Sequence, residues 1–153
     1  MSDYRATREV LQAMLNKAAE KLVAARLAWE AGLYGEVASR SYYAVFHALS
    51  AVLAARGMTF SSHSQVLGTF NRELVKSGDF PRETSSLLQR LFEDRQAGDY
   101  SITMSLGKRA AEKDLADATG LLERCREYLE QQTGYPLKLS SPRSKNGGAG
   151  GGK

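Results

Sequence analysis

Two stretches of this chain repeat apolar residues in alternating steps of four and three, and this period constrains the fold more than any other feature. At ~3.6 residues per turn, such steps keep side chains on one face of an α-helix. The positions are Leu11, Leu15, Ala18, Leu22, Ala25 and Trp29 in the first stretch, and Ala111, Leu115, Ala118, Leu122, Cys125 and Leu129 in the second. The pattern predicts two long helices, each burying one face against a neighbour.

Glycines and prolines divide the rest of the chain into further helical segments. Gly32 and Gly35 interrupt the first helix, and a second, alanine-rich helix is expected over 36–56 before Gly57. Serines at 61–64 offer N-caps for a short third helix, with Val66, Phe70 and Leu74 on its apolar face and its end at Gly78.

A fourth helix is expected to start near Pro81 and to reach Arg95, after which Gly98 weakens helical continuity. Residues 102–105 then form a connector to the last helix. No strand-like alternation and no internal repeat is found. We therefore expect an all-α fold, an up-and-down bundle of four to five helices.

The chain of 153 residues, with 42% hydrophobic content, suits one core. Residues 1–134 form the expected helical domain. Residues 135–153 are rich in Ser, Pro, Gly and Lys and are expected to be a flexible tail.

The net charge of +4 is a weak indication of a nucleic-acid partner, because the tail carries four of the cations (Lys138, Arg143, Lys145 and Lys153). The lone cysteine, Cys125, excludes an intrachain disulfide framework. No signal-peptide pattern begins the chain, and no apolar run approaches the ~20 residues that span a bilayer. A cytoplasmic protein without a membrane partner is expected.

Neither a metal site nor a cofactor is expected from the residue pattern. The two histidines, His47 and His63, lie in different segments without zinc-ligand spacing. Acids such as Glu93, Asp94 and Asp99 could hold magnesium, but scattered acids on a charged helix are more often solvated. No glycine-rich phosphate loop is present.

The segment Arg40-Ser-Tyr-Tyr-Ala-Val-Phe-His47 combines polar chemistry with an apolar face. At ~100° per residue, Arg40, Tyr43 and His47 share one stripe of the helix. Tyr42, Phe46, Leu49 and Leu53 share a neighbouring stripe that faces a core.

Arg40, His47 and Arg95 are the candidate catalytic residues. Cleavage of RNA without metal needs a base for the 2′-hydroxyl, an acid for the leaving oxygen and a cation for the phosphate, and histidine and arginine suit these roles. In the alternative interpretation, Arg40 pairs with an acid and His47 hydrogen bonds to a backbone carbonyl.

Tyr43, His63, Asp99 and Tyr100 are candidates for binding nucleotide or RNA. Arg95 and Asp99 are four residues apart, which favours a local ion pair, and a ligand phosphate could replace the acid. His63 lies among serines at an expected helix start, where backbone amides accommodate phosphate.

Three segments together resemble the prokaryotic HEPN-domain family: Arg40 to His47, Ser62-His63-Ser64-Gln65-Val66 with Phe70-Asn71, and Arg95-Gln-Ala-Gly-Asp-Tyr100. The resemblance covers roughly residues 7–130. It implies a helical bundle that dimerises, a role in a toxin-antitoxin system beside a small nucleotidyltransferase, and cleavage of RNA without metal.

The chain departs from that family's ribonuclease signature, an arginine and a histidine separated by four to six residues in a late helix. After Arg95, the positions open to histidine hold Tyr100, Ser101 and Ile102. Arg40 and His47 meet the spacing, but in the second helix. Tyr100 resembles the tyrosine that a partner nucleotidyltransferase modifies.

Three interpretations follow: a dimeric, metal-independent endoribonuclease, a non-catalytic module that binds nucleotide, RNA or a partner protein, and a purely structural helical protein.

Overall fold

The computed structural model describes residues 5–100 and 106–139, and this part of the chain is an all-α bundle without strands, as predicted. Its elements are α1 (Arg8–Glu30), α2 (Tyr34–Ala55), α3 (His63–Phe70), a π-helical segment η1 (Asn71–Val75), α4 (Glu83–Tyr100) and α5 (Lys108–Thr133). The apolar residues spaced by four and three lie on α1 and α5.

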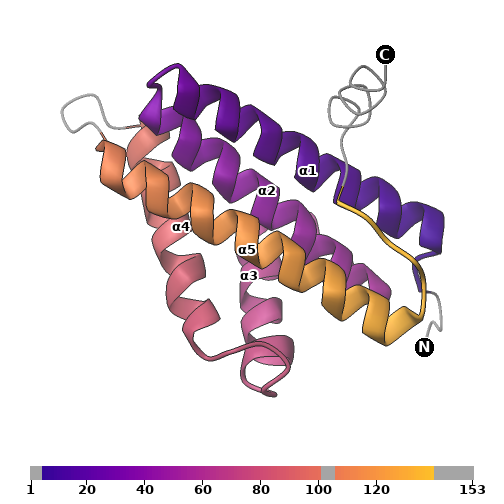
Figure 1. Cartoon of the computed structure of the whole chain (residues 1–153). Helices are drawn as coiled ribbons and strands as arrows, with labels where there is room; N and C mark the ends of the chain where they lie inside the picture. Colours follow the sequence, from indigo (N-terminus) through magenta and orange to yellow (C-terminus); the bar gives the residue numbers. More distant parts are fainter. Residues whose placement is uncertain (1–4, 101–105, 140–153) are drawn as a thin grey trace, which may run out of the picture.

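Helix α2 is the centre of the bundle, and Figure 1 shows α1 and α5 running alongside it with α3 and α4 on its other side. Four of its alanines, Ala38, Ala44, Ala48 and Ala51, are fully buried. Small side chains let helix axes approach closely. The apolar stripe predicted for this helix is confirmed at Tyr42, Leu49 and Leu53, which are at most 1% exposed.

The ends of the helices lie at capping residues and glycines, as the sequence predicts. The Thr7 hydroxyl accepts a hydrogen bond from the Val10 amide (3.2 Å) at the start of α1. Gly57 follows α2 with φ of 79°, a left-handed conformation that glycine adopts without steric cost.

The third predicted helix departs from a single regular element. α3 ends at Phe70, and η1 follows with the Lys76 amide donating to the Asn71 carbonyl oxygen (3.0 Å), five residues back. The Asn71 side-chain oxygen accepts a hydrogen bond from the Ser85 hydroxyl (2.8 Å), which ties this wider turn to α4.

Helix α4 runs through Gly98 to Tyr100, so the prediction of a weakened helix at Gly98 is wrong. Gly98 instead lies against Gly35 of α2: a Cβ built at Gly98 would be 2.7 Å from the Gly35 carbonyl oxygen. The two glycines allow backbone-to-backbone contact between α2 and α4.

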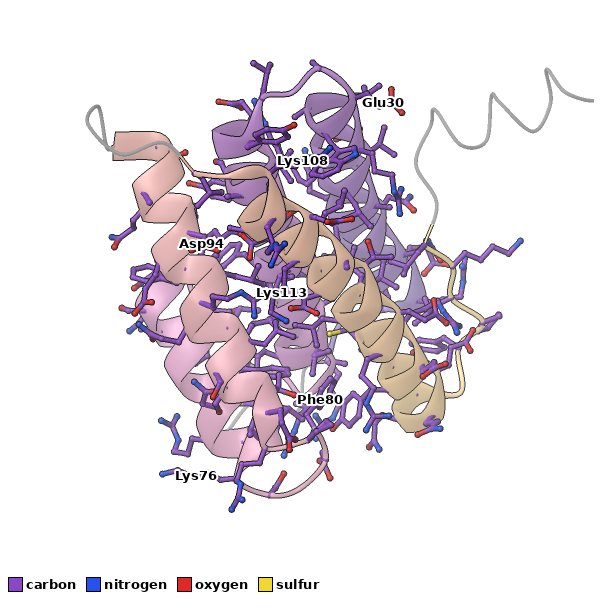
Figure 2. The ribbon with its side chains drawn as sticks, turned by 60° about the vertical axis from the view of Figure 1, so that its left-hand side comes forward. Glu30, Lys76, Phe80, Asp94, Lys108 and Lys113 are labelled. Atoms are coloured by element: carbon purple, nitrogen blue, oxygen red, sulfur yellow. The ribbon has the colours of Figure 1, made fainter. Side chains whose placement is uncertain are left out.

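Polar contacts join α4 to α5, the two helices on which Figure 2 labels Asp94 and Lys113. Arg90 of α4 donates to Asp114 (3.2 Å) and Asp117 (2.6 Å) of α5. Asp114 is fully buried, and burial together with a hydrogen bond to the Asp94 carboxyl raises its pKa far above the usual range of a carboxyl.

Residues beyond Gly134 continue to pack against the bundle as far as Leu139. Leu137 is 2% exposed, and Tyr135 and Leu139 lie against the same core. The Lys138 backbone exchanges two hydrogen bonds with the Gln12 side chain of α1. The packed part thus extends five residues past the predicted start of the tail, and the rest of that tail, 140–153, lies outside the described residues.

We predict that Gly98→Ala destabilises the protein by about 1–3 kcal/mol, because the added methyl overlaps the Gly35 backbone. Gly120→Ala in α5 is the matched control: nothing lies within 4 Å of its built Cβ, so the variant should gain up to ~1 kcal/mol from helix propensity. Denaturant unfolding measures both. Equal stabilisation of the two variants would contradict the close contact.

The Asp114 carboxyl predicts a pH-dependent stability. Its pKa of about 8 in the folded state exceeds the model-peptide value of 3.8, so the folded state holds more protons between these values and the free energy of unfolding falls as pH rises through this range. Asp114→Asn retains the geometry without this titration and should flatten the decline, by up to ~1.4 kcal/mol per pH unit. Unfolding measured from about pH 5 to about pH 9 tests this, and parallel curves would refute it.

Candidate functional site

Tyr42 is the core residue at which the candidate site begins. Its ring is 1% exposed on α2, and its hydroxyl lies 3.1 Å from Nδ1 of His63. Burial is the main cause that raises the Tyr42 pKa to about 12, so the phenol stays protonated near neutral pH.

His63 is the first residue of α3, where the Ser62 hydroxyl caps the helix by accepting from the Gln65 amide (3.4 Å). The imidazole stacks on Phe46 of α2, with ring centroids 4.0 Å apart, and meets the Tyr43 ring edge-on at 5.6 Å. Three α2 aromatics therefore fix the orientation of one α3 imidazole.

Arg95 approaches the same aromatics from α4. Its Nη2 donates to the Tyr43 hydroxyl (2.6 Å), and its Nε lies 3.0 Å from Oδ2 of Asp99, which confirms the local ion pair. The guanidinium carbon is 5.5 Å from the Tyr42 ring centre and 5.2 Å from that of Tyr43, within cation–π range. Only 14% of the side chain is exposed.

These contacts define one group of residues, called here the His63–Arg95 cluster: Tyr42, Tyr43, Phe46, His63, Arg95 and Asp99. Its members come from α2, α3 and α4. Burial, followed by the positive charge of Arg95, lowers the pKa of His63 below 6.5. Near neutral pH the cluster therefore holds a neutral imidazole beside a permanent cation, which is suited to proton transfer next to a bound phosphate.

His47 lies on the α1 side of the cluster and is half-buried. Its pKa is lowered by burial and then by Lys21 and Lys17 of α1, with a smaller effect from His63. The second imidazole is thus within electrostatic reach of the first, and two α1 lysines flank it.

The structure places Arg40 apart from the cluster. Its Nε lies 3.3 Å from Oε1 of Glu36, both side chains are substantially exposed, and none of its described contacts is to the cluster. This is the acid pairing of the alternative interpretation. Tyr100 ends α4 five residues after Arg95, and its side chain, with Ser101 and Ile102, lies outside the described residues.

Spacing along the chain did not identify the contact of His63 with Tyr42 and Phe46, which were assigned to the core. The positions are 21 and 17 residues apart across a turn, so no helical periodicity relates them. The sequence contained only a weaker indication of this contact. His63 lies at a capped helix start, and the apolar face of the helix that follows packs against α2.

Among residues 5–100 and 106–139, no group of three or more His, Cys, Asp or Glu side chains is arranged to hold a metal ion. Over the same ranges, none of the helices combines the length and apolar character needed to cross a bilayer.

Comparison with known proteins gives a family match over most of the chain. The profile of the HEPN domain matches residues 11–128. A UPF0332 protein of Thermotoga maritima is 38% identical over 92 residues, covering 60% of this chain and 70% of its own.

Two proteins of Methanocaldococcus jannaschii are also similar, and both carry the name "Putative toxin". One is 28% identical over 119 residues, covering 78% of this chain and 81% of its own. The other is 27% identical over 124 residues, covering 81% and 92% respectively.

We predict that Arg95→Gln raises the pKa of His63, because it removes a neighbouring positive charge while keeping a polar side chain. Arg40→Gln, a loss of the same charge outside the cluster, should leave the His63 pKa unchanged. NMR titration of the imidazole resonances provides the measurement. An unchanged His63 pKa in Arg95→Gln would show that the two groups do not interact.

Proposed function

This chain belongs to the HEPN family, and we propose that it is a toxin-like endoribonuclease that cleaves RNA without a metal at the His63–Arg95 cluster. The relatives named "Putative toxin" support the setting. The observation that carries the proposal is the convergence of an imidazole from α3 and a guanidinium from α4 on the two α2 tyrosines. His63 thereby supplies the imidazole that the segment after Arg95 lacks.

The proposed reaction is attack of a ribose 2′-oxygen on the adjacent phosphorus. A base removes the 2′-hydroxyl proton, the P–O bond to the 5′-oxygen breaks, and an acid protonates that oxygen, which leaves a 2′,3′-cyclic phosphate. When His63 Nδ1–H donates to the Tyr42 oxygen, Nε2 carries the lone pair and accepts the proton. The lowered pKa keeps this nitrogen unprotonated near neutral pH.

In this proposal, Arg95 binds the phosphate of the RNA. Tyr43 and Asp99 hold the guanidinium in place, and the tyrosine ring faces limit its movement. A planar guanidinium matches the geometry of phosphate oxygens, and its charge assists the hydrogen bonds that it donates to them. Developing negative charge on the phosphorane is stabilised by such a preorganised cation.

We assign protonation of the leaving oxygen to His47, the second imidazole within electrostatic reach of His63. Burial, Lys21 and Lys17 lower the pKa of His47, so it acts as the acid only when a bound phosphate stabilises its imidazolium form. The same two lysines favour an approaching phosphate chain. Arg40 is exposed beside Glu36 and has no role in the proposed reaction, so a variant at this position serves as the control.

The proposed partners are a second copy of the chain and a small nucleotidyltransferase that acts as antitoxin. Both rest on the similarity to HEPN proteins. Tyr100 is the proposed residue for modification by that enzyme.

The second candidate function is a non-catalytic module that binds RNA, nucleotide or a partner protein. The Arg95–Asp99 ion pair favours the protein-binding form of this candidate, because the carboxylate neutralises part of the charge that a phosphate needs. The two functions differ in one result, cleavage by the purified protein.

The test is cleavage of a mixed RNA pool in the presence of chelator, with wild type, His63→Ala, His47→Ala, Arg95→Ala and Arg40→Gln compared after circular dichroism confirms folding. We expect wild type and Arg40→Gln to cleave, and the other three to lose about 100-fold or more. No cleavage by wild type with retained RNA binding would favour the second function. Cleavage that survives in both His63→Ala and Arg95→Ala would refute the assigned site.

A further inference from the structure

A second polar site lies where the N-terminal segment meets the ends of two helices, and it shares no residue with the His63–Arg95 cluster. A cavity of about 360 Å³ is lined by Arg5, Ala6, Ala55, Arg56, Tyr128, Gln132, Thr133 and Tyr135. Figure 1 shows the start of α1 and the C-terminal ends of α2 and α5 at this end of the bundle. Ala55 follows Tyr42 by 13 residues on α2, which is about 20 Å along the helix.

Two arginines, Arg5 of the N-terminal segment and Arg56 at the end of α2, line this cavity. Arg5 donates to the Ala55 carbonyl oxygen (3.4 Å), and Arg56 to the Glu73 carbonyl oxygen (3.4 Å), with a longer 3.9 Å contact to the Glu73 carboxylate. All of these contacts are long. Arg56 also forms a hydrogen bond with the Tyr128 hydroxyl. Since each guanidinium has five N–H donors, these contacts with the described residues leave donors for a ligand.

The need to cap the C-terminal end of α2 does not explain why two arginines lie there. The Ala54 carbonyl oxygen already accepts from the Ala6 and Gly57 amides, and the Leu53 carbonyl oxygen from the Arg56 and Met58 amides. The negative end of the helix is thus largely satisfied by backbone donors.

The lining residues include two cations and no acid. Two carboxylates contact lining residues: Glu73 lies 3.9 Å from Arg56, and Asp79 Oδ2 accepts from the Tyr128 hydroxyl (3.5 Å). The wall also offers the Gln132 amide and two tyrosines. Its volume suits a phosphate with one attached ring or sugar, at the small end of ligand sites.

We propose that this cavity binds a phosphomonoester. Paired guanidiniums match a dianionic phosphate in charge and in the geometry of forked hydrogen bonds. Tyr128, Tyr135 and Gln132 contact the group that the phosphate carries. The same chemistry is presented by a small phosphorylated molecule and by the 5′-phosphate of an RNA strand.

The experiment uses the full chain and measures binding by calorimetry and NMR with inorganic phosphate, phenyl phosphate, AMP, and short RNAs that carry a 5′-phosphate or a 5′-hydroxyl. Stronger binding of phenyl phosphate and AMP than of inorganic phosphate is expected for a small-molecule source. A preference for 5′-phosphorylated over 5′-hydroxyl RNA, without binding of AMP, identifies the RNA end as the source.

Arg5→Gln and Arg56→Gln should each weaken the binding of the preferred probe about tenfold or more, equivalent to ~1.4 kcal/mol. Arg8→Gln is the matched control, because Arg8 lies three residues from Arg5 but outside the lining. Arg56→Lys replaces Arg56→Gln in the test if the latter folds poorly. It keeps the positive charge but removes the forked pair of N–H donors, and it should also weaken binding.

No binding of any probe at millimolar concentration near 0.15 M salt, or equal affinities in Arg5→Gln, Arg56→Gln and Arg8→Gln, would overturn the proposal. The result is independent of the ribonuclease proposal, since Arg5→Gln leaves every residue of the His63–Arg95 cluster in place. Cleavage by this variant at the wild-type rate together with lost phosphate binding would separate the two sites.

Discussion

The enclosure of α2 by α1, α3, α4 and α5 is the constraint on which the rest of this structure depends. A helix buried on several sides has room for few large polar side chains, and each needs a partner. Its alanines and Gly35 meet the need for close packing. Tyr42 and Tyr43 are large polar side chains on this helix. Their hydroxyls have partners, since that of Tyr42 lies beside His63 and that of Tyr43 accepts a hydrogen bond from Arg95. The candidate site therefore follows from polar groups that the core itself must satisfy.

Helix α4 is held in the bundle by charge as well as by apolar contact. Arg90 reaches α5 through Asp114 and Asp117, and five residues later Arg95 reaches α2 through Tyr43. Between them, burial and the neighbouring Asp94 raise the pKa of the Asp114 carboxyl. Buried ionic contacts specify geometry strongly but tolerate the loss of one member poorly. The position of Arg95 on α4 thus depends in part on contacts that α4 makes outside the site.

The fold was largely predictable because apolar periodicity and helix punctuation are local signals. The stepped residues of α1 and α5, the Ser62 cap and the helix ends near Gly32, Gly57 and Gly134 were all visible in the sequence. Gly98 was misread because propensity describes an isolated helix, whereas its role is contact with Gly35. The packing of Leu137 was equally non-local.

The site was predicted less completely, for the same reason. Arg95–Asp99 follows from helical spacing, and spacing also grouped Arg40 with Tyr43 and His47, although Arg40 turns to Glu36 instead. The approach of His63 to Tyr42 depends on how α3 docks, and no period in the chain encodes it. Family resemblance pointed to three segments that the structure brings together, but it did not predict the contacts between them.

The account rests on RNA phosphate entering the His63–Arg95 cluster, and NMR of the imidazole and guanidinium side chains tests this most directly. A short 2′-fluoro RNA pool, which cannot undergo 2′-oxygen attack, would be titrated into the protein in chelator. The account predicts that His63 and Arg95 resonances shift together and that the His63 pKa rises, since a nearby phosphate stabilises the imidazolium. Binding that leaves both resonances and the His63 pKa unchanged would contradict it.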